Sequence, residues 1–169
     1  MLVRFWGVRG SVPWATPSAI GYGCNTPCIE VRDDATGAYL ILDAGSGLVG
    51  LSQTLGNEPR HAPVLLTHYH WDHTQGLPFF GPLYMHGWKA ELFSPQFDNT
   101  PRDWVQTIFQ SPNFPVPYEA LPNRPMMNLI RPEPLEIGGF RLSVQPLTHP
   151  GGAFAYRVHG STGDLCYVT

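Results

Sequence analysis

Residues 66–76 read LTHYHWDHTQG, and they place four potential metal ligands within six positions. The four are His68, His70, Asp72 and His73, and they follow the apolar run VLL at 64–66. A short apolar run of this kind predicts a buried strand, so the polar side chains lie where the strand gives way to a turn. If the strand continues, His68 and His70 point to the same face, because side chains alternate along a strand.

The mixture of imidazole and carboxylate in this segment is typical of a zinc site, with manganese or iron as alternatives. Four neighbouring side chains cannot all reach one ion without strain, so their density favours two ions. The competing interpretation is that these are polar residues at a strand end that make only hydrogen bonds, as a lone histidine usually does. The complete H-x-H-x-D-H pattern at the end of a predicted strand favours metal binding.

The composition predicts one globular domain covering residues 1–169, since 43% of the residues are hydrophobic and only 14% are charged. Ten Lys and Arg residues and a net charge of -3 disfavour an extended nucleic-acid surface, so we expect a small or short substrate. The N-terminus lacks the apolar core of a signal peptide, and no run reaches the roughly 18 apolar residues of a membrane helix. We therefore expect a cytoplasmic protein with no membrane partner.

The cysteines indicate reduced thiols. Cys24, Cys28 and Cys166 cannot all pair, and an odd number of cysteines without an export signal is typical of a reducing compartment. The C-x3-C spacing of the first two has no matching pair elsewhere, so small buried residues are favoured over a zinc knuckle.

Short apolar runs bounded by glycine and proline predict a chain dominated by strands. Expected strands lie at 2–6, 28–32, 39–43, 63–67, 83–86, 141–147, 153–158 and 165–169. Expected helices lie at 74–79, 88–93 and 101–110, the last because proline suits a first helical turn and Asp103 suits the positive end of the helix dipole.

The segment 111–134 contains seven prolines, so it is neither a regular helix nor a central strand. We expect a long ordered loop there. It is either a surface excursion or the rim of a site, and its apolar residues Phe114, Tyr118, Met126 and Met127 favour the rim.

The motif THYHWDH at 67–73 resembles the T-H-x-H-x-D-H signature of the metallo-β-lactamase superfamily. The resemblance implies an αββα sandwich of the α+β class, of which this chain would supply the N-terminal half and the first strands of the second half. It implies two zinc ions. His68, His70 and His149 would hold the first ion, and Asp72 and His73 would contribute to the second.

Asp43, in LILDAGSG at 40–47, matches an aspartate that in this superfamily orients the metal-binding loop without binding metal. A turn-forming aspartate before glycine is the alternative interpretation. The remaining histidines, His61, His86 and His159, match no motif, and we expect ordinary surface or core roles for them.

Four further segments, taken in order, resemble the branch of the superfamily that contains phosphoribosyl cyclic phosphate diesterases and relatives of ribonuclease Z. They are FWGVRGSVP at 5–13, GCNTPCIEVR at 23–32, FPVPY at 114–118 and HPGGAFAYRV at 149–158. This resemblance implies hydrolysis of a small cyclic or short phosphodiester by a metal-activated water, with Asp72 also accepting a proton from that water. Arg9 either meets a phosphate or forms an ordinary ion pair.

The run LCYVT at 165–169 resembles the strand that carries an aspartate bridging the two metals in this superfamily. No acid follows Thr169, and no histidine matches the final ligand of the superfamily. We therefore expect either a homodimer whose partner completes the fold or a fragment of a longer chain. Three functions stay open: a phosphodiesterase, a metal-binding or dimerising remnant without catalysis, and a thioester or lactone hydrolase.

Overall fold

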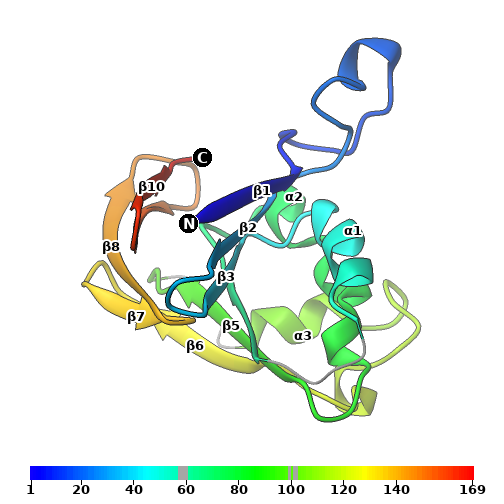
Figure 1. Ribbon diagram of the computed structural model, residues 1–169. Coiled ribbons are helices and arrows are strands. Elements are labelled where there is room, and N and C mark those ends of the chain that lie inside the picture. The colour runs from blue at the N-terminus through cyan, green and yellow to red at the C-terminus, as the bar shows by residue number, and fades with distance from the viewer. Residues whose placement is uncertain (57–60, 99, 101–102) are drawn as a thin grey trace.

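The computed structural model describes residues 1–56, 61–98, 100 and 103–169. Two β-sheets pack face to face, and helices cover the outer face of the larger sheet (Figure 1). The strands are β1 (Leu2–Gly7), β2 (Cys28–Asp33), β3 (Ala38–Leu42), β4 (His61–Leu65), β5 (Lys89–Pro95), β6 (Met126–Ile130), β7 (Leu135–Ile137), β8 (Phe140–Leu147), β9 (Ala153–Gly160) and β10 (Gly163–Tyr167). The α-helices are α1 (Gly47–Thr54), α2 (Trp71–Thr74) and α3 (Trp104–Ile108).

The larger sheet has the strand order β1-β2-β3-β4-β5-β6. Its first three strands are antiparallel, whereas β3, β4, β5 and β6 run parallel to one another. The smaller sheet has the order β10-β9-β8-β7 and is antiparallel throughout. Because parallel strands end at one edge of a sheet, the loops that follow β3 and β4 lie next to each other.

Alternating side chains divide the core into two layers. On β3, Leu40 and Leu42 pack between the sheets, where they join Phe140, Leu142 and residues of β9. The intervening Ile41 packs on the other face, in the cluster formed with the helices. The larger sheet is therefore apolar on both faces, as a sheet covered on both sides must be.

The outer face of the smaller sheet is polar. Arg141, Ser143 and Gln145 alternate with inward apolar residues along β8, and all three are exposed. On the neighbouring strands Arg157 and Asp164 form an ion pair, with Nη2 and Oδ2 2.7 Å apart. This face is therefore solvated, and the expectation of a homodimer or of a longer chain stays a prediction.

Most expected elements are present, but several are wrong. The expected helix at 88–93 is strand β5, and the expected strand at 83–86 is instead a 3-10 turn, Gly81–Leu83, followed by a loop. The β5 residues are good helix formers, but parallel pairing with β4 and β6 overrides that propensity. The signal was the alternation of polar Lys89 and Glu91 with buried Ala90 and Leu92.

Helix α1 and strands β6 and β7 were also not expected. Helix α1 contains Gly47 and Gly50, which lower helix propensity but let it approach the Trp6 backbone and ring. Strand β6 lies inside the expected loop 111–134, and its place at the sheet edge agrees with a segment too rich in proline for a central strand. The expected helix at 101–110 corresponds to α3, which is shorter than expected. Positions 101 and 102 of the expected range lie outside the described residues. None of the described helices is long and apolar enough to cross a membrane.

Candidate metal centre

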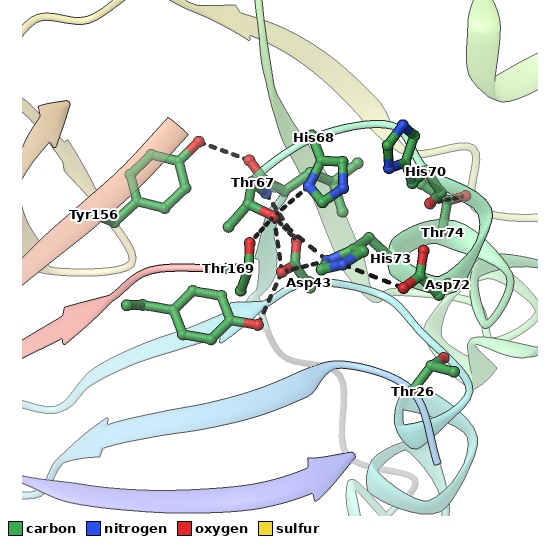
Figure 2. A network of polar contacts seen from close by, with 12 residues as sticks. Thr26, Asp43, Thr67, His68, His70, Asp72, His73, Thr74, Tyr156 and Thr169 are labelled. Atoms are coloured by element: carbon green, nitrogen blue, oxygen red, sulfur yellow. Dashed lines mark hydrogen bonds and ion pairs between the residues drawn. The ribbon is translucent and has the colours of Figure 1, made fainter. Parts of the chain in front are cut away.

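The HxHxDH segment leaves the larger sheet where β4 ends at Leu65. His68 and His70 therefore lie in the following loop and not on a continued strand, which differs from the alternation expected from the sequence. Asp72 and His73 lie in the single turn of α2, where the His73 N–H donates to the His70 carbonyl at 2.9 Å. The loop and the helical turn together direct the four side chains toward a common region (Figure 2).

His149 joins this region from the other sheet, from the loop after β8. One ring nitrogen from each of His68, His70 and His149 lies within 4.8 Å of the others, and His149 Nε2 is 3.1 Å from His70 Nδ1. Tetrahedral zinc with Zn–N bonds of about 2.0–2.1 Å places its ligand nitrogens about 3.3 Å apart. The three imidazoles therefore fit one shared divalent ion.

Asp72 and His73 come together beside the three histidines. Asp72 Oδ2 is 3.6 Å from His73 Nε2 and accepts a hydrogen bond from the Ser11 N–H at 2.8 Å. The His73 ring lies 4.1 Å from the His68 ring, centroid to centroid. Among the described residues no third carboxylate, histidine or cysteine joins these two to form a second three-ligand group.

Asp43 is fully buried beneath these side chains and accepts several hydrogen bonds. Its Oδ1 accepts from the Thr67 N–H at 2.7 Å, and its Oδ2 accepts from His73 Nδ1 at 2.8 Å (Figure 2). The Oδ2 also accepts from the Tyr167 hydroxyl at 2.9 Å. Because a carboxylate only accepts, the Nδ1 of His73 must carry the proton. The lone pair of a neutral His73 is thereby left on Nε2, which faces Asp72.

The pKa values of His68 and His73 shift in opposite directions in this network. Burial lowers the pKa of His68 to about 4, and the neighbouring His73 adds to this fall. Burial also acts to lower the pKa of His73, but the hydrogen bond to Asp43 and the charges of Asp43 and Asp72 outweigh it, so this pKa is raised. His68 is therefore neutral near pH 7, which is the form that binds a metal.

Comparisons with known proteins agree with this architecture, although no family model and no curated protein matches the sequence. YhfI from Bacillus subtilis, a metallo-β-lactamase fold protein, aligns with a TM-score of 0.69 over 97% of this chain and 60% of its own, at 19% identity. Human tRNase Z, short form, aligns with a TM-score of 0.64 over 99% and 68%, at 16% identity. A diphosphatase of the PhnP family aligns with a TM-score of 0.60 over 92% and 61%, at 19% identity.

The chain has the metallo-β-lactamase fold. It spans 60% to 68% of the lengths of these three proteins, so it supplies a part of what their chains contain. The expected fold is confirmed, including its partial form. At identities below 20% the likeness concerns the fold, and the chemistry has to be argued from the residues of this chain.

Within this metallo-β-lactamase fold, backbone contacts hold the segment 66–76, which we call the metal loop, against the loop after β3. The Ala44 N–H donates to the His73 carbonyl and the Gly76 N–H donates to the Ala44 carbonyl, both at 2.8 Å. A Cβ on Gly45 would lie 2.3 Å from the Asp72 carbonyl oxygen, and one on Gly76 would lie 2.1 Å from the Gly45 carbonyl oxygen. Both positions therefore require glycine, a role that sequence reasoning did not assign.

Two tyrosines of the smaller sheet contact the site in a way that was not expected from the sequence. The buried Tyr156 hydroxyl donates to the Leu66 carbonyl at 2.6 Å, and Tyr167 reaches Asp43. Next to them, the Thr169 hydroxyl donates to the Thr67 hydroxyl at 3.2 Å. These contacts attach the metal loop of one sheet to the strands of the other. The available signal was the burial expected for tyrosines in predicted strands, which gives no partner.

The other histidines and the cysteines do not belong to the three-histidine group. His61 pairs with Glu91, and His159 Nδ1 lies 3.1 Å from Asp164 Oδ2. His86 is exposed. The three cysteines are free, and Cys28 is fully buried.

Proposed function

We propose that this chain belongs to a metal-dependent hydrolase that cleaves a phosphodiester with a metal-activated water. The observation that carries the proposal is the convergence of His68, His70 and His149, because two sheets must pack correctly to bring the third imidazole to the first two. Imidazole and carboxylate donors suit zinc best, with manganese and iron as alternatives. The likeness in fold to human tRNase Z supports a phosphodiester as the bond cleaved, and the likeness to a PhnP-family diphosphatase supports phosphate chemistry more broadly.

We assign His68, His70 and His149 to the first ion, and Asp72 and His73 to a second. A bound divalent ion supplies Lewis acidity and lowers the pKa of its water toward neutrality. Asp43 orients His73 by accepting from its Nδ1, which keeps Nε2 available as a ligand. This is the role of an outer partner that fixes a histidine tautomer.

Asp72 is the residue that we assign to proton transfer. Its Oδ2 is held by the Ser11 N–H, while its Oδ1 makes no hydrogen bond with any described residue. The side chain is 14% exposed, so the free oxygen can meet solvent or substrate. A carboxylate oxygen at this place can accept the proton of the attacking water.

A second candidate is a metal-binding or dimerising module without catalysis. It is favoured by the second site, where the described residues bring together only Asp72 and His73. A partner copy or further chain would then have to complete that site. A thioester or lactone hydrolase is the third alternative, because the metal ligands do not select the scissile bond.

Metal analysis and hydrolysis of bis(p-nitrophenyl) phosphate by the purified chain test the proposal. We expect bound metal, turnover, and loss of the first ion in His149→Ala, whereas the exposed His86→Ala retains both metal and turnover. Two ions per chain with turnover would exclude the module without catalysis. One ion or none, without turnover, would exclude the enzyme for this chain.

A further inference from the structure

The segment 8–23, which we call the arm, forms an open pocket next to the metal centre. Figure 1 shows the arm, in blue between β1 and β2, projecting beyond the end of the larger sheet. The pocket has a volume of 860 Å³ and is lined by arm residues alone, among them Arg9, Ser11, Trp14, Thr16 and Tyr22. Because the N–H of Ser11 binds Asp72 at 2.8 Å, the pocket shares a wall with the metal centre.

Arg9 is the one charged residue that lines this pocket. Its Nε is buried without a hydrogen-bond partner, and the side chain forms no ion pair with any described residue. Burying part of a cation without a partner is unfavourable, and a guanidinium matches the oxygens of a phosphate or carboxylate. The buried Nε does not itself meet a ligand, but the guanidinium has no ion-pair partner among the described residues, so its charge is available to an anionic group in the pocket.

The same pocket presents two large aromatic side chains to solvent. Trp14 is 59% exposed and Tyr22 is 91% exposed, although rings of this size usually bury most of their area. No carboxylate lines the pocket to repel an anion. Exposed rings beside a free cation are the combination that binds a flat ring carrying a negative charge, because the ring stacks while the anion pairs.

The backbone of the arm is fixed where it meets the metal loop. Ser11 has a φ of +71°, which is unfavourable for a residue with a side chain. The hydrogen bond from this residue to Asp72 helps to hold the strained conformation. This contact fixes the position of the arm pocket relative to Asp72, the residue that we assign to proton transfer.

We propose that the arm pocket is a substrate subsite for an anionic group joined to a flat ring, with Arg9 on the anion and Trp14 or Tyr22 against the ring. The inference rests on the proposed function for its role in substrate choice, but not for its binding chemistry. A nucleoside monophosphate is the simplest ligand with both features. A molecule held here would extend from the subsite toward Asp72.

Calorimetric titration of the metal-free chain with adenosine 5′-monophosphate and with adenosine tests whether Arg9 binds the anionic group. We expect the monophosphate to bind about tenfold or more tightly than adenosine, because only the phosphate meets the guanidinium. Arg9→Gln removes this difference and Arg9→Lys retains part of it. The control Arg141→Gln removes the same charge from the far face of the smaller sheet and leaves binding unchanged. Urea unfolding of each variant checks that it is folded.

Trp14→Leu tests the stacking of the ligand ring, and we expect it to weaken the binding of both ligands several-fold. Phe79→Leu is the matched control, because Phe79 is 58% exposed outside the arm. Equal binding of the two ligands by the wild-type chain, or an unchanged preference in folded Arg9→Gln, overturns the proposal. Association of the chain that depends on Trp14, with no nucleotide bound, also overturns it in favour of a second copy at the pocket.

The experiments distinguish a failure of the arm-pocket subsite from a failure of the proposed hydrolase. Metal binding and turnover without an effect of Arg9→Gln on monophosphate binding would remove the subsite and leave the hydrolase. Monophosphate binding that depends on Arg9, in a chain that takes up no metal, would retain the pocket and remove the hydrolase.

Discussion

Replacing Asp43 by asparagine is expected to move a proton on His73. In the wild-type chain the carboxylate accepts from Thr67 N–H on one side and from His73 Nδ1 on the other. An asparagine keeps one acceptor and gains one donor. The backbone N–H of Thr67 cannot reverse its role, so the amide oxygen faces Thr67 and the amide nitrogen faces His73. His73 must then accept at Nδ1 and carry its proton on Nε2, the atom that faces Asp72.

The size of the effect follows from the hydrogen bonds. A hydrogen bond to a charged group stabilises a protein by about 1.5–3 kcal/mol and a neutral one by about 1 kcal/mol, so we expect Asp43→Asn to lower the free energy of unfolding by about 2 kcal/mol. Loss of an outer partner of a metal ligand typically costs 10–100-fold in affinity. We expect that loss at the ion held by Asp72 and His73, and a smaller one at the three histidines.

The pKa of His73 is expected to fall in the same variant. Burial, which lowers this pKa, persists, whereas the hydrogen bond and the charge of Asp43, which raise it, are both lost. Nitrogen-15 NMR of the metal-free protein reports both the protonated ring nitrogen, above this pKa, and the pKa itself by titration. Asp34→Asn, at an exposed carboxylate in the β2–β3 turn, is the control. A proton that stays on Nδ1, or a pKa of His73 that does not fall, would refute the reasoning.

Three other changes test packing contacts, the first two beside the site and the third between the end of β2 and the β9–β10 turn. Tyr156→Phe removes the buried hydrogen bond to the Leu66 carbonyl and should lower the free energy of unfolding by about 1–3 kcal/mol in urea titrations. Gly45→Ala, with its Cβ 2.3 Å from a backbone oxygen, should cost about 3 kcal/mol or more, whereas Gly21→Ala, with open space, should change stability by less than about 0.5 kcal/mol. Hydrogen bonds from the β9–β10 turn lower the pKa of Asp33, so the stability it adds is complete above about pH 3.9 and is lost as the pH falls through its folded pKa. The stability difference between the wild type and Asp33→Ala should therefore shrink in acid, and a constant difference down to pH 2 would contradict this account.

Much of the fold could be predicted because its signals are local. Strands β2, β3, β8 and β9 were expected within a few residues of their observed bounds, since each is a short apolar or alternating run bounded by turn residues. Strand β5 was mistaken for a helix, because its residues favour helices and only pairing with two neighbouring strands makes it extended. Helix α1 was missed for the converse reason, since its glycines are tolerated by packing against β1.

The sequence by itself determined which donor types lie together in the HxHxDH segment, because residues six apart or fewer cannot be far apart in space. Only the tertiary structure decided how these donors are used. His149 lies 79 residues after His70 and reaches it because β8 packs across from β3 in the larger sheet, and Asp43 selects the tautomer of His73 through a contact between two loops. Such contacts depend on sheet pairing and on side-chain direction over long sequence separations, and no local pattern encodes them.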